Sequence, residues 1–317
     1  MYTMAYDVQV GQFQLGMLDR IEINRSVELL ADTATVVLPG AEYNKALDVE
    51  AKLKRGDAVS IKIGYEESGL VEEFRGYLQS VSTDSGSITL MMEDDLYTLR
   101  KGIPNENLKR VKLSELLASV LTAADSNLQI DCDYEWTYEK FVIHNATAYD
   151  VLKKVQEECN ADIYIQNNVL HIHPPGAMVG LERLYDFSLN VEKSDLTYRH
   201  ASDRKYKVVV KATQPDGTVK ELEVGSTGGN KIEVKCPTSD EASMQLRGEV
   251  ELKRRSFDGY EGNITTWLIP ECLPGDSAVL RDRDYPEKDG TYFVKSVTTE
   301  FSKDGGKRIV ELGFRLN

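Results

Sequence analysis

The sequence predicts an α+β protein that is mainly β, with two similar β-barrel domains and an intervening small α+β module. Three observations predict this fold class: short alternating strands near both ends of the chain, two amphipathic helices in its middle, and a turn-and-strand pattern that occurs twice. The 317 residues suffice for two or three domains and for a core without metal or disulfides. We expect an N-terminal β-barrel over 1–100, the α+β module over 101–176, and a strand and helix segment plus the second β-barrel over 177–317.

Residues 1–100 have the spacing of five or six short strands. Turn residues separate the strands, including Pro39-Gly40 and Asp84-Ser85-Gly86. Short strands at this spacing are typical of a β-sandwich or barrel. The predicted strands, which are rich in β-branched or alternating apolar residues, cover 19–24, 32–38, 58–63, 74–81 and 87–93.

Residues 101–176 change to a helical pattern. Two helices are expected here. The second begins at Thr147, which with Asp150 resembles a capping box, and stops at Asn160. Asn167-Asn168 then predicts a tight hairpin, because asparagine tolerates positive φ. The first helix has Ser114 as its expected N-cap and is indicated by an apolar stripe at helical spacing: Leu113, Leu116, Leu117, Val120 and Leu121.

Residues 177–317 return to strands around one helix. Pro215-Asp216-Gly217 predicts a hairpin, and the glycine-rich stretch 225–230 predicts a flexible loop. Thr238 and Glu241 predict a capping box that opens a helix ending in the basic run 253–255. The expected apolar face of that helix is Ala242, Leu246 and Val250. A last strand-rich block begins at about residue 263.

The same turn-and-strand unit occurs near both ends of the chain. Gly56-Asp57 and Gly275-Asp276 each precede a strand, and Gly76 and Gly290 each open a second strand. Both copies continue to a turn containing Asp and Gly and then to an alternating strand. The shared order indicates an internal repeat. Three such chains in a ring would present six similar barrels and could join a sixfold tube to a threefold spike, although the sequence itself shows no trimer.

These features resemble the tail hub family of contractile-tailed phages, also called late control protein D. They are also similar to the N-terminal hub region of type VI secretion spike proteins. Each motif alone is weak, and the resemblance rests on their order along most of the chain. The matching stretches are 56–59, 74–78, 93–99, the helix and hairpin from Thr147 onward, 273–276, 290–294 and the closing strand.

The resemblance implies a structural baseplate hub that acts through its interfaces and is not an enzyme. It implies a homotrimeric ring whose partners are the tail tube protein, the central spike protein and other baseplate proteins, with the tape measure protein as a further candidate. The location would be the tail baseplate, or an equivalent injection particle, after assembly in the bacterial cytoplasm. No long β-helix repeats precede Asn317, so we expect the spike to be a separate polypeptide.

The charge balance excludes some function classes. With 52 acidic and 38 basic residues the net charge is −14, which argues against binding of nucleic-acid phosphates and docking on anionic membranes. An acidic wall would also let a polyanion slide past. No signal peptide or membrane-spanning stretch is recognised. The four cysteines, Cys132, Cys159, Cys236 and Cys272, have no zinc-like spacing, and we expect buried free thiols from a reducing cytoplasm.

No catalytic, cofactor-binding or metal site is predicted. His171 and His173 share one strand face, but no third ligand is near them in sequence, so we expect exposed strand histidines. Glu93-Asp94-Asp95 reads as a solvated turn instead of a glycosidase pair, because adjacent carboxylates on a strand end point to different faces. Asp282, Asp284 and Asp289 lack the calcium-loop spacing, and Ser226 lacks the Gly-x-Ser-x-Gly order.

Two other function classes stay open from the sequence. One is a tail-associated cell-wall hydrolase. The other is a carbohydrate-binding or receptor-binding tail module, for which clustered exposed aromatic residues are expected. Only two tryptophans are present, Trp136 and Trp267, although sixteen tyrosines keep the second class open.

Overall fold

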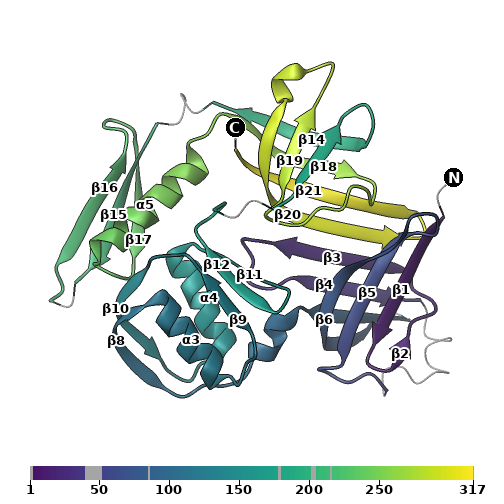
Figure 1. The fold of residues 1–317 in the computed structure, drawn as a ribbon, viewed down its shortest axis with the longest axis horizontal. Helices are drawn as coiled ribbons and strands as arrows, with labels where there is room; N and C mark the ends of the chain where they lie inside the picture. The colour runs from purple at the N-terminus through teal and green to yellow at the C-terminus, as the bar shows by residue number, and fades with distance from the viewer. Residues whose placement is uncertain are drawn as a thin grey trace.

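The computed structural model describes residues 3–39, 52–84, 86–177, 180–200, 205–214 and 216–316. It is dominated by one large, mostly antiparallel sheet, and the described residues form three α-helices, so the predicted mainly β, α+β class is confirmed (Figure 1). No helix among these residues is both long and apolar enough to cross a membrane.

The large sheet contains the same six-strand arrangement twice. In the first repeat the neighbouring strands run β1-β5-β6-β7-β4-β3, and in the second they run β13-β19-β20-β21-β18-β14. The one difference in direction is that β13 pairs with β19 in parallel, whereas β1 pairs with β5 antiparallel. The first repeat comprises β1 (Met4–Val10), β3 (Arg20–Ser26), β4 (Thr33–Leu38), β5 (Ala58–Tyr65), β6 (Gly69–Asp84) and β7 (Ser87–Glu93), with the short β2 (Phe13–Gln14) beside β1. The second comprises β13 (Glu182–Asp186), β14 (Val191–Arg199), β18 (Gly259–Thr266), β19 (Ser277–Arg281), β20 (Gly290–Ser302) and β21 (Gly305–Arg315), with the 3-10 turn η3 (Pro286–Lys288).

Two smaller units interrupt this pattern. The middle module lies between the repeats and consists of η1 (Asp95–Leu99), β8 (Glu106–Lys112), α3 (Leu113–Ala123), β9 (Gln129–Cys132), β10 (Thr137–Ile143), α4 (Ala148–Cys159), β11 (Asp162–Gln166) and β12 (Val169–His173). A second unit is inserted inside the second repeat, between β14 and β18. It consists of β15 (Tyr206–Thr213), β16 (Val219–Gly225), β17 (Asn230–Cys236) and α5 (Glu241–Arg255). The second repeat therefore starts at β13, well before the strand block recognised from the sequence.

The hydrophobic cores follow this division in most of the described chain. The core of the first repeat includes Ile21, Ile61 and Leu90, and the described core of the second includes Tyr185 and Val297. A third core joins the middle module to the unit around α5, which pack together as Figure 1 shows. The repeats also share buried contacts: Leu268 and Phe301 of the second repeat lie in the core of the first, and Val27 packs with Phe293 and Phe314 in a small separate cluster.

The second helix and the hairpin of the middle module match the sequence prediction. Thr147 is the N-cap of α4, and its side chain accepts a hydrogen bond from the Asp150 backbone N–H. Asn160 ends the helix in the left-handed conformation with φ of 59°. Asn167 and Asn168 have φ of 52° and 64°, as a type I′ hairpin turn requires.

Two predicted helix starts are wrong. α3 starts at Leu113 with Lys112 as N-cap, so Ser114 lies inside the first turn. α5 is capped by Asp240, whose carboxylate accepts the Ser243 N–H at 3.0 Å, so Thr238 is not the cap. At α5 the Asp240 side chain caps a free N–H of the first turn, whereas at α3 the Lys112 side chain makes no cap and the Lys112 N–H donates to the Glu115 carboxylate at 3.3 Å.

The predicted apolar face of α5 is also partly wrong. Ala242 is exposed, whereas Ser243, Met244, Gly248 and Glu251 are buried together with Val250. The helix packs on the β16-β15-β17 sheet, and a Cβ built on Gly248 would lie 2.6 Å from a Val224 methyl carbon. The close approach at this glycine fixes which face of the helix is covered.

Candidate assembly interface

The Gly-Asp turns of the two repeats have the same side-chain hydrogen bond. The Lys54 N–H donates to the Asp57 carboxylate at 2.8 Å, and the Leu273 N–H donates to the Asp276 carboxylate at 3.0 Å. Both aspartates therefore close the turn that starts the next strand.

The backbone around the turns repeats as well. The Gly56 N–H donates to the Leu78 carbonyl at 2.8 Å, and the Gly275 N–H donates to the Val294 carbonyl at 2.9 Å. Both glycines have φ of 90°, which strongly favours glycine. A β-bulge follows Leu78 and Val294 in both repeats. The Gly-Asp turns of the predicted repeat are therefore confirmed. The predicted strand start at Gly76 is wrong, because β6 begins at Gly69 and the pairing makes Tyr292, not Gly290, the counterpart of Gly76.

Asp276 has more partners than Asp57. Its carboxylate also accepts the Leu181 N–H at 2.8 Å and bonds Arg183 at 3.1 Å, and the residue is 5% exposed. These bonds connect the turn to β13. The second copy of the turn has therefore become part of a buried polar network.

The two repeats meet head to tail within the main sheet. The second half of β20 pairs antiparallel with β3, so that Ser296 faces Ser26 and Phe301 faces Ile21. Thr298 and Asn24, which face each other in this register, share a side-chain hydrogen bond of 2.8 Å. The contact uses the β20 side of the second repeat and the β3 side of the first, so it joins two different surfaces of related units.

A buried ion pair also crosses between the repeats. Arg308 of β21 is 1% exposed and bonds Glu73 of β6, which is 5% exposed. The guanidinium also donates to the Pro270 carbonyl at 2.6 Å. Such a pair tolerates few alternative arrangements, because leaving one buried charge alone costs several kcal/mol.

The related edges at the other ends of the repeats lack this pairing. Among the described residues β14, the counterpart of β3, pairs with β18 alone. Ser80–Thr83 of β6, the counterpart of Ser296–Thr299 of β20, pairs with β7 on one side, and no described strand lies on the other. Val81 is half-buried and Thr83 exposed, whereas their counterparts Val297 and Thr299 are buried.

The Glu93-Asp94-Asp95 candidates have structural roles. Glu93 is 2% exposed and forms a two-pronged ion pair with Arg100, with the shortest contact at 2.7 Å. Asp94 caps η1 through the Leu96 N–H and also accepts the Asp32 N–H, each at 2.9 Å. The stretch is therefore not the solvated turn that we expected, although its carboxylates do point to different partners.

Burial raises the pKa of Asp32 to about 6, and burial together with the neighbouring Asp32 charge raises that of Asp94. Both residues line a cleft of about 960 Å³ between the main sheet and the β11–β12 turn. Raised carboxyl pKa values are typical of functional sites. Here backbone N–H groups hold both carboxylates, including the bond from the Ser26 N–H to Asp32 at 3.2 Å.

The other acidic and hydroxyl candidates are parts of turns. Asp282 accepts the Asp284 N–H at 3.0 Å and pairs with Lys288 at 2.6 Å, while the Asp282 N–H bonds Asp289 at 2.8 Å. Ser226 lies in the turn between β16 and β17 and donates its N–H to the Tyr206 carbonyl at 3.0 Å. Lysine occupies the position that an ion would need beside Asp282.

The histidine pair differs from the sequence prediction. His173 is 2% exposed and His171 is half-buried, so the expected exposed histidines are wrong. The structure also brings Asp131 from β9 against both rings. Among the described residues, this is the group of side chains whose ligand atoms lie close enough together to share a metal ion.

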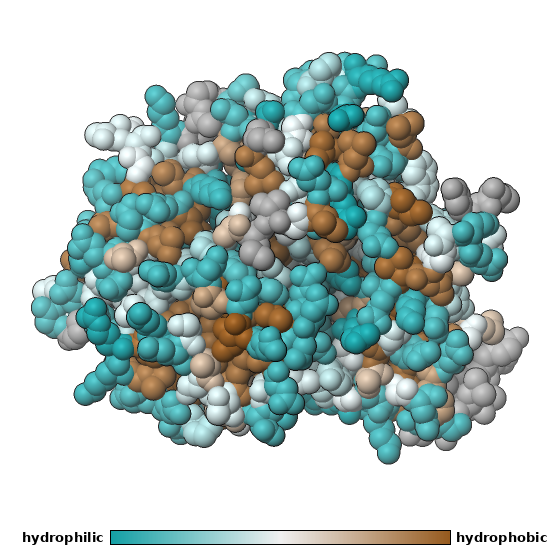
Figure 2. Space-filling model, in the orientation of Figure 1, coloured by the Kyte–Doolittle hydropathy of each residue, from teal (hydrophilic) through white to brown (hydrophobic). Residues whose placement is uncertain are grey.

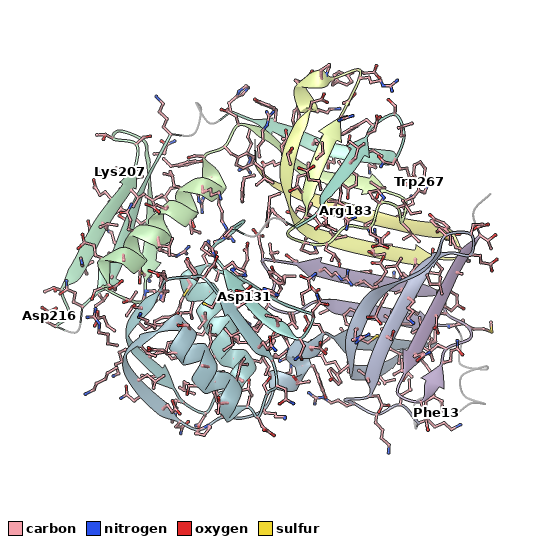
Figure 3. The ribbon with its side chains drawn as sticks, in the orientation of Figure 1. Phe13, Asp131, Arg183, Lys207, Asp216 and Trp267 are labelled. Carbon is pink, nitrogen blue, oxygen red and sulfur yellow. The ribbon has the colours of Figure 1, made fainter. Side chains whose placement is uncertain are left out.

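The aromatic and cysteine residues are mostly internal. Trp136 is 1% exposed, and Trp267, labelled at the right of Figure 3, is 46% exposed. On the face in Figure 2 apolar residues form several patches separated by hydrophilic ones.

Cys159, Cys236 and Cys272 are buried free thiols as predicted, whereas Cys132 is half-buried. Burial raises the pKa of Cys272 to about 11.

The fold is shared by phage tail proteins and components of related secretion machines. A tail protein from Neisseria meningitidis MC58 superposes with a TM-score of 0.68 at 15% identity, over 98% of this chain and 97% of that one. The 43 kDa tail protein of prophage MuSo2 from Shewanella oneidensis gives 0.67 at 15% identity, over 97% and 95%. The Escherichia coli c3393 protein, described as a type VI secretion component similar to phage T4 tail proteins gp27 and gp5, gives 0.62 at 7% identity, over 98% and 77%.

No protein-family profile and no curated protein sequence matches the chain. At these identities the shared property is the fold, which extends over nearly the whole chain. The resemblance to tail hub proteins that was recognised from the order of weak motifs is confirmed at that level.

Proposed function

We propose that this protein is a structural baseplate hub of a phage-type tail or contractile injection machine. Three copies would form a ring of six related repeats that joins a sixfold tail tube to a threefold central spike. The partners would be further copies of this chain, the tube protein, the spike protein and other baseplate proteins, with the tape measure protein as an additional candidate. The observation that carries this proposal is the head-to-tail contact of β20 with β3.

The ring follows from repeating that contact between chains. When two repeats pair head to tail, one edge of the β20 type and one edge of the β3 type remain unpaired, at opposite ends of the pair. Further copies can pair through these edges by the same rotation, and a ring forms if the rotation closes. Within the described ranges, the surfaces of these two kinds without a strand partner are the edges of β14 and of Ser80–Thr83 in β6. We therefore assign β14 of one copy to the β6 edge of the next, as an added antiparallel strand.

The internal junction also predicts the register between chains. Thr298 faces Asn24 within the chain. The counterpart of Thr298 in the first repeat is Ser82, and the counterpart of Asn24 in the second repeat is Thr197. The same correspondence places Val81 opposite Tyr198. Tyr198 is 37% exposed, and Ser82 and Thr197 are exposed, so these side chains are available to a neighbouring copy.

Disulfide trapping tests this assignment. In a Cys132→Ser background, the pair Ser82→Cys and Thr197→Cys should link chains into closed trimers on oxidation, under conditions where tails assemble. The matched control pairs Ser82→Cys with Ser194→Cys, which is exposed and three residues out of register. Equal linking by both pairs, or linked dimers that never close, would contradict the ring. Mass measurement of the reduced particle and a density map of the assembled tail give independent readings.

The hydrolase alternative has less support. The acidic candidates are held by backbone N–H groups or by arginine, and the tail-protein fold is shared over nearly the whole chain. The receptor-binding alternative would need grouped exposed aromatic residues, whereas Trp136 is in the core. Release of soluble fragments from purified cell wall by this chain would instead establish an enzyme.

A further inference from the structure

We propose that Asp131, His171 and His173 bind a divalent transition-metal ion of the Zn²⁺ type. The strand pairing brings the three side chains together. β12 carries the two histidines two residues apart, which places both on one face of the strand. β9 pairs with β12 in parallel and sets Asp131 directly beside His171. Asp131 lies near the centre of the view in Figure 3.

The distances between the three ligand atoms match one face of a tetrahedron around zinc. His171 Nδ1 lies 3.1 Å from Asp131 Oδ2, His173 Nε2 lies 3.5 Å from the same oxygen, and the two nitrogens are 3.5 Å apart. Zinc bonds of about 2.0–2.1 Å at tetrahedral angles give ligand separations of about 3.3–3.4 Å. Two imidazoles and one carboxylate are also donors that zinc commonly takes, with a fourth position for water.

A second carboxylate sets the orientation of the buried ring. Asp133 Oδ1 lies 2.5 Å from Nδ1 of His173, on the side of the ring away from the proposed ion. This is the carboxylate–histidine–metal arrangement that fixes the tautomer of a ligating histidine, with Nδ1 protonated and the Nε2 lone pair free. Tyr164 of β11 stacks on His171, with ring centroids 4.8 Å apart and an interplanar angle of 14°.

The hydrogen-bonding capacity of His173 supports a bound metal ion. Both of its ring nitrogens face carboxylate oxygens, those of Asp131 and Asp133, although the residue is 2% exposed. A neutral imidazole has one N–H and one lone pair, so one nitrogen would face a carboxylate without a proton between them. With the Nδ1–H of His173 donated to Asp133, the Nε2 lone pair faces the Asp131 carboxylate, and a cation between these two atoms would be held by both. The nearby Nδ1 of His171 makes the metal ion the better solution, because it satisfies three donors at once.

The ion would stabilise the pairing of the short strand β9 with β12 in the middle module. β9 has four residues and pairs with β12 through four register positions. A metal bond from Asp131 to the two histidines closes a loop of 40 residues, because the Asp131–His171 contact spans that separation. We therefore assign the ion a structural role, and this role does not depend on the proposed ring.

Metal titration of the purified, chelator-treated full chain tests the site. Calorimetry with Zn²⁺ should show one ion per chain, and Zn²⁺ should raise the thermal unfolding midpoint. Co²⁺ in place of Zn²⁺ should give the intense visible absorption of a tetrahedral site. Binding should weaken more than about 100-fold in Asp131→Asn and in His171→Asn, and about 10–100-fold in Asp133→Asn, as expected for removal of a ligand and of its orienting partner.

His144→Asn is the matched control, since His144 is an exposed histidine of the same module. It should leave the affinity and the cobalt spectrum unchanged. Asp131 is half exposed, so Asp131→Asn remains informative if a histidine variant fails to fold. Failure to bind Zn²⁺ at micromolar concentration, or the same affinity in Asp131→Asn and wild type, would overturn the proposal.

Discussion

Aspartate 276 shows how one side chain can acquire more partners than its counterpart in a repeat. Asp57 and Asp276 close the same turn, but Asp276 also holds Leu181 and Arg183 and is nearly inaccessible to water. Its loss leaves several donors of a buried network without an acceptor, and each such donor costs about 1–3 kcal/mol.

We accordingly predict that Asp276→Ala lowers the free energy of unfolding by about 3 kcal/mol or more, whereas Asp57→Ala lowers it by about 1 kcal/mol. Urea denaturation of both variants measures the difference. Equal losses would show that the additional bonds of Asp276 contribute nothing to stability.

Arginine 308 and Glu73 join the two repeats through a buried ion pair. Glu73→Gln should destabilise the chain by about 3–5 kcal/mol, because Arg308 then stays buried without a counter-charge, whereas Arg308→Met should cost less, because Arg25 still lies 4.0 Å from Glu73. The double replacement Arg308→Met with Glu73→Met should recover most of that loss. A double-mutant cycle from chemical denaturation measures the coupling, and additive losses would contradict it.

At the scale of secondary-structure elements, helix α5 depends on one glycine for its docking. Gly248 lies against Val224 and Val210 of the three-stranded sheet, with no room for a Cβ at normal contact distance. The capping of the helix by Asp240 fixes where it starts, but the contact at Gly248 fixes which residues it buries.

Gly248→Val should therefore lower stability by about 1–3 kcal/mol, as overpacking of a tight contact does. Glu249→Ala on the exposed side of the same helix is the control and should change stability by less than about 0.5 kcal/mol. Hydrogen exchange of β15 and α5 would locate the effect. A neutral result for Gly248→Val would mean that the helix can shift outward without loss.

At the scale of the whole molecule, the two repeats explain how one chain can present related edges on both sides. The two repeats pair with each other through β20 and β3, whereas β14 and Ser80–Thr83 of β6 each have one edge without a strand partner within the described parts of the chain. Open strand edges are otherwise a liability for a folded protein, and the proposed strand from another copy would cover them.

Thr83→Lys should separate assembly from folding. Thr83 is exposed on β6, so the isolated chain should keep its stability within about 0.5 kcal/mol. In the ring the new charge would face Leu196 of the next copy, and assembled particles should be lost. Thr213→Lys, on an exposed residue of β15 away from both edges, is the control. Normal tail assembly with Thr83→Lys would exclude the β6 edge as the contact between copies.

The sequence by itself determined the features that depend on neighbouring residues. The Gly-Asp turns, the capping box at Thr147 and the Asn167-Asn168 hairpin are local hydrogen-bonding patterns, and their order was enough to recognise the repeat and the tail hub resemblance. Local propensity was less reliable at two helix starts: Asp240 took the capping role predicted for Thr238, and α3 begins one residue before Ser114 without a capping side chain.

Only the tertiary structure decided which distant segments meet. The pairing of β20 with β3 joins residues from opposite ends of the chain, and β9 brings Asp131 to histidines that lie 40 positions later. Strand register across such separations is set by packing and by the covering of edges, and neither leaves a signal at fixed spacing in the sequence. For this reason the repeat could be read from the residues, while its junction, the free edges and the candidate metal site could not.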